Sequence, residues 1–394
     1  MPTARVPAAS RVAFMAHPPK TARTEGTAGE VSLCFSEIQD VEVQLEFIKN
    51  EVFSDMEDKT VQVIGVGSPV VDFVVETDDE FVATLPGQKG GMELVDSPTL
   101  KALLKSIKDA PVKAPGGSAG NTTFALARMG MPCSFMGKVG RDDNGDYYKT
   151  LFKAVGGDVS RFKTDGADPT ACCVSLVTPD SERTMRTDLG AAMGFSPTDI
   201  GADDFKACRH VHVEGYLLFN RELLFAVLKA AKASDCTVSL DLGSFEVVEA
   251  AKDILPGILE KYVDIVFANE EEAAAFSGGK DPETGLAALG HLCRVAAVKV
   301  GKDGAYLKDE NETTHVPAMV VDKVIDTTGA GDYWAAGFLF AHLNGYSLTK
   351  SGCVGALFGK HVIGCMGADL PADAWGDIIA ETTLLLSKKE KNLC

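Results

Sequence analysis

Apolar and polar positions in the second half of the chain repeat in an order typical of alternating strands and helices. Short apolar runs predict strands, and amphipathic stretches between them predict helices, notably at residues 222–232. Because strands separated by helices pair in parallel, this order predicts an α/β fold whose sheet is covered on both faces. The predicted strands of this region are residues 211–214, 237–241, 264–268 and 295–300.

Further elements are predicted on either side of this region. Residues 122–129 predict a helix that Gly130 ends, and residues 351–363 and 374–386 predict two helices near the end of the chain. The remaining predicted strands are residues 61–68, 69–75, 170–178 and 184–187.

A glycine-rich turn stands between an apolar run at residues 319–325 and an apolar segment at residues 333–341, an order that predicts a strand, a turn and a helix. Glycines at the start of a helix leave main-chain N–H groups free to bind an anion, and an acid in the first turn would lie beside a bound phosphate. The alternative interpretation is a tight turn in which the helix dipole favours the acid. The turn consists of Asp326, Thr327, Thr328, Gly329, Ala330, Gly331 and Asp332.

Composition narrows the class of protein. The 394 residues suffice for one large α/β domain or two average ones, and 45% hydrophobic with 24% charged residues is ordinary for a soluble globular protein. The net charge of −18 argues against nucleic acid or an anionic membrane as the main partner, and no apolar run is long enough to span a bilayer. Ten cysteines without a repeated spacing argue against a disulfide framework or a zinc site and favour a reducing, cytoplasmic compartment.

The first residues differ in composition from the rest. Residues 1–24 contain basic residues and no acid, and they are rich in Ala, Ser, Thr and Pro, as in an organelle transit peptide or a disordered tail. We therefore expect an N-terminal extension over residues 1–58, partly disordered, and a folded domain over residues 59–394.

Neither of two common nucleotide-binding motifs is present in full. Gly65 and Gly67 stand as in a dinucleotide-binding turn, but Val70 occupies the position of the third glycine, which argues against a dinucleotide-dependent oxidoreductase. No Gly-x-x-x-x-Gly-Lys-Ser/Thr sequence occurs, so the chain is not a P-loop kinase.

His210 and His212 alternate on one predicted strand without a third metal ligand in view, and we interpret them as structural.

Residues 326–332 resemble a signature of the ribokinase (PfkB-type) family of carbohydrate and nucleoside kinases, and the resemblance extends over roughly residues 60–385. It implies a ribokinase-like three-layer α/β/α fold with a mostly parallel central sheet, and a small β-strand lid from about residues 69–95 and 168–190. By this resemblance Asp332 is the general base that takes the proton from the acceptor hydroxyl. The hole for the transferred phosphoryl group would be formed by Gly329, Ala330 and Gly331.

The resemblance also implies an acceptor site. Asp72 would hold hydroxyls of the acceptor, since a carboxylate accepts two hydrogen bonds at once; a polar residue on the solvent side of an edge strand is the alternative interpretation. Gly117 would let the acceptor approach the main chain, and Asn121 would bond its hydroxyls. Adenosine kinases usually carry an asparagine where this chain has Ser68.

For the phosphate donor, the resemblance implies ATP with Mg²⁺. Arg183 would bind the transferred phosphate, because an arginine stays charged and forms forked hydrogen bonds, and Arg186 is a second candidate; an exposed hairpin arginine is the alternative. Asn269 and Glu272 would organise the magnesium ion through its waters. The same pair, three residues apart at a helix start, also predicts a capping box.

Two further sites follow from the resemblance. Lys299, Gly301 and Gly304 would form the nucleotide loop, where small residues at a strand end let ATP approach. Asp326 would hold a monovalent cation such as K⁺. The main-chain carbonyls implied with it are those near Thr328, Val362 and Gly367.

The sequence therefore predicts an enzyme that transfers the γ-phosphoryl group of ATP to a primary hydroxyl of a small molecule. The acceptor would be an adenosine-like ribonucleoside or a small sugar such as fructose or ribose, and the chain would act as a monomer or a homodimer. A kinase-like protein that keeps the fold as a binding or scaffolding module is the second hypothesis. Retention of the glycines and of Asp332 argues against it.

Overall fold

The computed structural model describes residues 61–180 and 182–389. The extension predicted for residues 1–58, with its transit-peptide interpretation, lies outside the described residues. Within them, no helix has both the length and the apolar character needed to cross a membrane.

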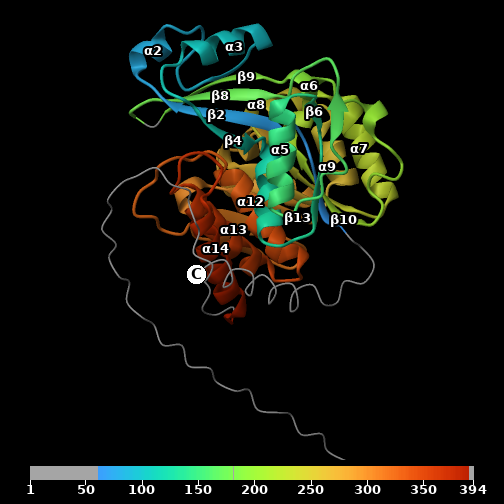
Figure 1. Ribbon diagram of the computed structural model, residues 1–394. Helices are drawn as coiled ribbons and strands as arrows, with labels where there is room; N and C mark the ends of the chain where they lie inside the picture. Colours follow the sequence, from blue (N-terminus) through green and yellow to red (C-terminus); the bar gives the residue numbers. More distant parts are fainter. Residues whose placement is uncertain (1–60, 181, 390–394) are drawn as a thin grey trace, which may run out of the picture. The chain divides into compact units, whose positions relative to one another are not determined.

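The central element is an eight-stranded sheet in the order β15-β14-β13-β12-β11-β10-β1-β5 (Figure 1). The six strands from β13 to β5 pair in parallel, whereas β14 pairs antiparallel with β13 and with β15. The parallel sheet predicted from the strand–helix alternation is therefore confirmed. The strands are β1 (Val61–Val66), β5 (Cys133–Met136), β10 (Cys208–Glu214), β11 (Thr237–Asp241), β12 (Ile265–Asn269), β13 (Val295–Lys299), β14 (Ala305–Lys308) and β15 (Thr313–Val316).

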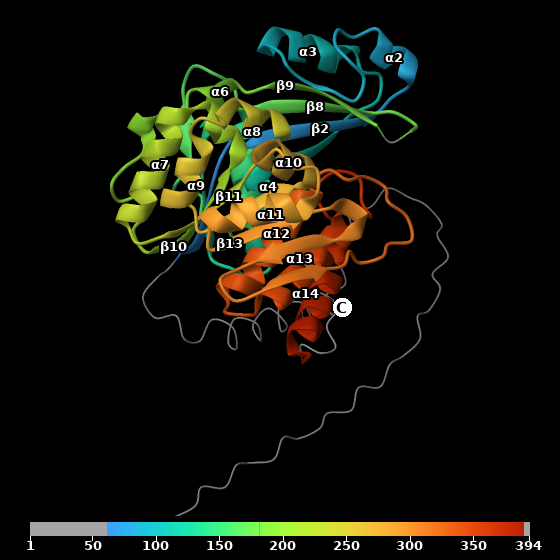
Figure 2. The same ribbon diagram turned by 180° about the vertical axis from the view of Figure 1, so that it is seen from behind.

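Helices cover both faces of this sheet because its strands are apolar on both sides. Along β12, Ile265 and Phe267 pack into one hydrophobic cluster while Val266 and Ala268 pack into the other. One layer contains α4 (Ser118–Arg128), α5 (Asp143–Ala154), α12 (Ala330–Leu343), α13 (Leu348–Val362) and α14 (Ala372–Ser387). The other, seen in Figure 2, contains α7 (Arg221–Ala233), α8 (Phe245–Ala251), α9 (Leu255–Tyr262), α10 (Glu270–Ser277) and α11 (Pro282–Leu292).

A second sheet of five strands, the lid sheet, has the order β3-β9-β8-β2-β4. Its strands are β2 (Val70–Glu76), β3 (Met92–Leu94), β4 (Val112–Gly116), β8 (Cys172–Val177) and β9 (Arg183–Asp188). On its outer side lie α2 (Asp79–Ala83) and α3 (Ser97–Ser106) (Figure 1). The region 69–95 is therefore only partly strand, because the Asp78 side chain accepts a hydrogen bond from the Phe81 amide and starts a helix there.

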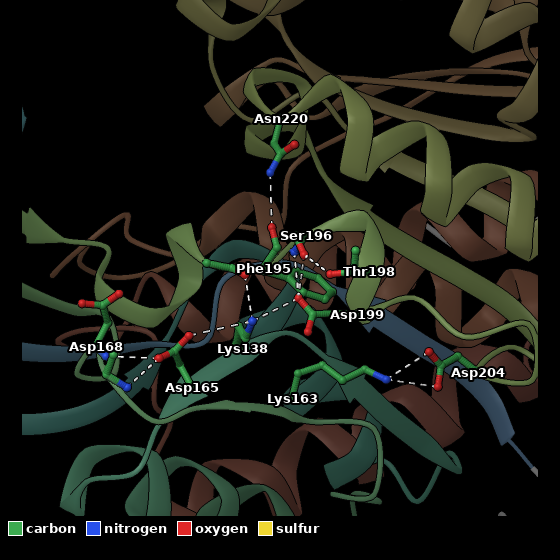
Figure 3. Close-up of polar contacts among 12 residues, drawn as sticks. Lys138, Lys163, Asp165, Asp168, Phe195, Ser196, Thr198, Asp199, Asp204 and Asn220 are labelled. Carbon is green, nitrogen blue, oxygen red and sulfur yellow. Dashed lines mark hydrogen bonds and ion pairs between the residues drawn. The ribbon is translucent and has the colours of Figure 1, made fainter.

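A polar junction fixes the segment that follows the last lid strand. Figure 3 shows the ammonium group of Lys138, on β6 (Lys138–Gly140), between this segment and β7 (Lys163–Asp165). Lys138 Nζ donates to the Gly194 carbonyl at 2.8 Å and to Asp199 Oδ2 at 3.1 Å. Lys163 Nζ lies 3.0 Å from Asp204 Oδ2. These bonds join the exit of the lid sheet to the main body.

Several elements differ from the sequence prediction, three of them by three residues or more at a point near the site. Residues 319–325 are not a strand: Val320 is 89% exposed, and the Ile325 amide bonds the Ile363 carbonyl at the end of α13. A β-branched run forms a strand only where another strand pairs with it, and sequence propensity does not supply that partner. Helix α12 begins three residues before the predicted start and α4 four residues before.

His210 and His212 are buried within the main sheet, on the same side of β10. His210 Nδ1 lies 2.8 Å from Thr237 Oγ1 and its Nε2 lies 2.8 Å from Ser239 Oγ. The same Ser239 hydroxyl lies 2.8 Å from His212 Nδ1. Burial lowers the pKa of both imidazoles, that of His210 far below its ordinary value and that of His212 to about 4. The two rings are therefore neutral partners in a hydrogen-bonded row, which agrees with their interpretation as structural.

We expect Ser239→Ala to destabilise the fold, because it leaves two buried imidazole nitrogens without a partner. The loss of unfolding free energy should be about 1–3 kcal/mol, measured by urea unfolding. Ser387→Ala, which removes an exposed hydroxyl, is the control and should change stability by less than about 0.5 kcal/mol. Equal stability of the two variants would contradict a supporting role for the Ser239 hydroxyl.

Candidate active site

Asp332 lies in the first turn of α12 and is held by α4. Ser118 Oγ donates to Asp332 Oδ1 at 2.7 Å, and Asn121 Nδ2 donates to Asp332 Oδ2 at 2.8 Å. The Thr122 hydroxyl donates to the Asp332 carbonyl at 3.0 Å. Two helices that are distant in sequence therefore fix one carboxylate, which leaves little rotational freedom to its oxygens.

The main chain before Asp332, residues 326–332, is called the glycine turn here. Gly329 has a φ of 73°, and a Cβ built on it would lie 2.8 Å from Ala368 Cβ, so both its conformation and its surroundings require glycine. A Cβ at Gly331 would lie 3.0 Å from Lys299 Nζ. The Ala330 amide donates to the Thr327 carbonyl at 3.1 Å. The main chain at the start of this helix lies beside an ammonium group, an arrangement that favours an anion.

The carboxyl ends of two parallel strands that flank β12 bring further charges to the same edge. Lys299, at the end of β13, places Nζ 2.9 Å from Oδ2 of Asp241, at the end of β11. Asp241, Asp332 and Glu272 attract the Lys299 ammonium group, and these three carboxylates raise its pKa against the effect of burial. Three acids and one lysine leave negative charge at this edge, which is the donor chemistry that suits Mg²⁺.

Asn269 and Glu272 form the capping box predicted for the start of α10. The Glu272 amide donates to Asn269 Oδ1 at 2.8 Å, and the Asn269 amide donates to Glu272 Oε2 at 2.8 Å. Asn269 Nδ2 also donates to Glu272 Oε1 at 2.8 Å. The buried Glu272 carboxylate is thus held rigidly next to Asp241.

The residues expected at the acceptor come together from three segments. A Cβ at Gly117, whose φ is 87°, would lie 2.2 Å from the Ser68 carbonyl oxygen, and one at Gly116 would lie 2.3 Å from Asp72 Oδ2. These two glycines let the start of α4 approach the turn between β1 and β2. Ser68, Asp72, Gly117 and Asn121 therefore surround one place beside Asp332.

Glu214, at the end of β10, lies beneath this place. Its Oε1 accepts the Ser68 amide at 2.8 Å and its Oε2 accepts the Ala119 amide at 3.3 Å. Sequence reasoning overlooked Glu214, Asp241 and Ser118. A signal was available for the two acids, because each ends a predicted parallel strand, and ligands bind at that edge of an open α/β sheet.

Four carboxyl groups around the candidate site hold their protons unusually strongly. Removal from water raises the pKa of Asp72, Glu214, Glu272 and Asp332 to about 7 in each case. Neighbouring negative charge adds to the effect, with Asp241 acting on both Glu272 and Asp332. A carboxylate with such a pKa accepts a proton near neutral pH, as a general base must.

Arg183 and Asp326, expected in separate roles, contact each other. The Arg183 guanidinium Nη2 forms an ion pair with Asp326 Oδ2, and its Nη1 donates to Ser175 Oγ at 3.1 Å. Asp326 also accepts the Thr328 amide at 3.0 Å and the Gly367 amide at 2.7 Å. The pair joins the lid sheet to the glycine turn.

Three other residues predicted for the site, Arg186, Gly301 and Gly304, make none of the contacts described above. Arg186 is buried and donates to the Met185 carbonyl at 2.9 Å, and its position in β9 places it on the face opposite to Arg183. Gly301 is exposed with a φ of 55° and free space around it. Gly304, with a φ of 98°, has a packing reason to be glycine, since a Cβ there would lie 2.0 Å from the Val316 carbonyl oxygen.

Comparison with known proteins finds sugar and nucleoside kinases by family, by sequence and by structure. Residues 96–375 match the family described as pfkB family carbohydrate kinase. The chain is 27% identical over 262 residues to a 5-dehydro-2-deoxygluconokinase of Geobacillus thermodenitrificans, covering 63% of this chain and 78% of that enzyme. It is 26% identical over 334 residues to an adenosine kinase of Dictyostelium discoideum, covering 79% of this chain and 97% of that enzyme. The structure of adenosine kinase from Sinorhizobium meliloti superimposes with a TM-score of 0.74 at 31% identity, covering 82% of this chain and 99% of that one.

The raised pKa of Asp332 predicts how stability should depend on pH. In the ligand-free protein the unfolded carboxyl ionises near its ordinary pKa, whereas the folded one ionises only near pH 7, so ionisation costs the folded state stability as pH rises from about 4 to 7. Asp332→Asn removes that cost. The stability of this variant relative to wild type should therefore be higher at pH 7.5 than at pH 5.

Urea unfolding of both proteins at the two pH values measures this difference. Asp253→Asn is the matched control: Asp253 is an exposed acid whose pKa is lowered by its hydrogen bond with Arg221, so it is ionised at both pH values. A difference between Asp332→Asn and wild type that does not change with pH would show that the Asp332 carboxyl is not desolvated.

Proposed function

The chain belongs to the pfkB family of carbohydrate kinases, and we propose that within it this enzyme phosphorylates the primary hydroxyl of a ribonucleoside. Members of the family move a phosphoryl group from ATP to a sugar or nucleoside hydroxyl, so the chain is a phosphotransferase with an alcohol acceptor. A free sugar is the alternative acceptor, as the resemblance to a 5-dehydro-2-deoxygluconokinase indicates.

The observation that carries the proposal is the position of Asp332 in the first turn of α12, directly after the glycines of the glycine turn. Ser118 and Asn121 hold its oxygens, and its pKa of about 7 suits a group that takes a proton at neutral pH. We assign Asp332 as the general base for the acceptor hydroxyl. Of the hole expected from Gly329, Ala330 and Gly331, the amides of the two glycines would stabilise the charge on the phosphoryl group as it is transferred, because the Ala330 amide already donates to the Thr327 carbonyl.

Lys299 supplies positive charge at the same place. Its ammonium group lies close to Gly331 and is fixed by Asp241 at 2.9 Å, so it is positioned before any ligand arrives. Mg²⁺ would be held through Asp241 and Glu272, directly or through water, and would neutralise the phosphates. The excess of acids at this edge supports that assignment, because a divalent cation relieves their mutual repulsion.

The acceptor would lie between Asp332 and Asp72, with Ser68, Gly117 and Asn121 around it. Val70 precedes Asp72 by two residues on the same face of β2, and it packs with Ala171 and Cys173 of the adjoining segment. Met185 and Ala192 extend this apolar patch. Val70, Ala171 and Cys173 are buried, so a bound acceptor would meet this cluster through the half-buried Met185 and Ala192. An apolar contact beside a hydroxyl-binding carboxylate suits a ribonucleoside, whose base is apolar on its faces, better than a free sugar, which carries hydroxyls all round.

Asp332→Asn should abolish most of the turnover. An amide cannot take the hydroxyl proton, whereas it keeps the size of the carboxyl group, so we expect kcat to fall roughly 10²–10⁴-fold with little change in substrate binding. Steady-state ADP release and binding of the acceptor by calorimetry measure the two quantities. Asp253→Asn should behave as wild type, and unchanged turnover in Asp332→Asn would exclude this residue as the base.

The choice of acceptor is tested by ADP release with Mg²⁺ over a panel of adenosine, other ribonucleosides, ribose and fructose. We expect turnover on a ribonucleoside, and Cys173→Ser together with Met185→Gln should raise the KM for it by about 10-fold or more through loss of apolar contact. Cys172→Ser is the matched control, since Cys172 lies on the opposite face of the same strand. Turnover on a free sugar alone would replace the nucleoside assignment with the carbohydrate one.

A further inference from the structure

Asp326 is a buried carboxylate whose charge must be balanced. Its side chain is 6% exposed, and it stands three residues before Gly329 in the glycine turn. Its two oxygens accept the amides of Thr328 and Gly367, which fixes the shape of the turn. A buried negative charge beside amides that hold a phosphoryl group would oppose binding of that group unless a positive charge neutralises it.

Resemblance to the ribokinase family implied a monovalent cation in this role, but the residues present leave it little room. Asp326 Oδ2 already accepts the Gly367 amide and the guanidinium of Arg183. The Val362 carbonyl, one of the expected ligands, accepts the Cys365 amide at 3.1 Å. A cation on Asp326 would also be repelled by the guanidinium group.

The guanidinium group that occupies this place comes from the lid sheet. Arg183 begins β9, its Nη1 is held by Ser175 of β8, and its side chain is 10% exposed. Arg183 also lies close enough to Asp72 to lower the pKa of that acid against the effect of burial. One lid side chain thus carries the positive charge for both the glycine turn and the acceptor carboxylate.

We propose that the Arg183 guanidinium replaces the monovalent cation at Asp326, so that the enzyme works without K⁺ and the lid itself supplies this charge. The transferred phosphoryl group is then neutralised by Lys299 and the turn amides rather than by Arg183. The proposal rests on the proposed kinase function for its activity readout, but not for its binding readout. The proposal also links the lid sheet to the glycine turn, because the charge of Asp326 is neutralised only while Arg183 of the lid sheet contacts it.

The test compares KCl with choline chloride at equal ionic strength, using the full chain. The melting temperature and the turnover of wild type should be the same in the two salts. Arg183→Gln should free Asp326 for a cation, so K⁺ should raise its melting temperature by about 1–3 °C and its turnover about 10-fold. Arg183→Lys, which keeps the positive charge, should remain indifferent to K⁺.

Two controls assign the effect to Asp326. Arg186→Gln removes a buried arginine from the other face of the same strand and should not create a response to K⁺. The double variant Arg183→Gln with Asp326→Asn should lose the response, because the carboxylate that binds the ion is gone.

The outcomes separate this proposal from the assignment of function. A wild type that K⁺ activates about 10-fold, or an Arg183→Gln variant that ignores K⁺ in both readouts, overturns the replacement while leaving the kinase assignment intact. A K⁺-specific rise in the melting temperature of Arg183→Gln, seen without turnover on any acceptor, supports the replacement and contradicts the assigned substrates.

Discussion

Negative charge gathered at the carboxyl edge of the parallel sheet is the constraint on which the rest of this structure depends. Asp241, Glu272 and Asp332 share one ammonium group, that of Lys299. Burial makes each ionised carboxylate costly, which is why the pKa of Asp332 and of Glu272 is about 7. The fold tolerates this cost because each acid is held by hydrogen bonds, and a divalent cation bound together with the phosphates of ATP would neutralise the negative charge.

Holding these acids requires contacts between distant segments. Asp332 is fixed by side chains of α4, more than two hundred residues earlier in the chain. Glu214 fixes the Ser68 and Ala119 amides in the same way, so the turn after β1 and the start of α4 take their positions from one carboxylate. The glycines at 117 and 329 have positive φ values that other residues rarely adopt, and they permit the close approach that these bonds need. Stability at this edge is thus given up for a site that is formed before substrate binds.

The two arginines of β9 lie on opposite faces of the strand and therefore have different partners. Arg183 contacts Asp326 and acts on Asp72, whereas Arg186, three residues later, is buried on the other face against the Met185 carbonyl and the Pro86 carbonyl. The same alternation separates Cys173, which pairs with Asp72 in the register of the lid sheet, from Cys172 in the hydrophobic cluster on the other face. Residues that are equivalent by type therefore differ in role because the side chains of a strand alternate between its two faces.

The sequence by itself determined the parallel sheet, the alternation of strands and helices that builds it, and the glycine turn. Those features follow from local causes: apolar periodicity, glycine where the main chain turns sharply, and a capping box in which Asn269 and Glu272 bond each other three residues apart. It misassigned residues 319–325 because their β-branched character says nothing of whether a strand lies alongside. Only the tertiary structure decided which charges meet. Lys299 with Asp241 and Arg183 with Asp326 join positions 58 and 143 residues apart, and such pairings depend on how strands and lid pack together rather than on any short-range pattern.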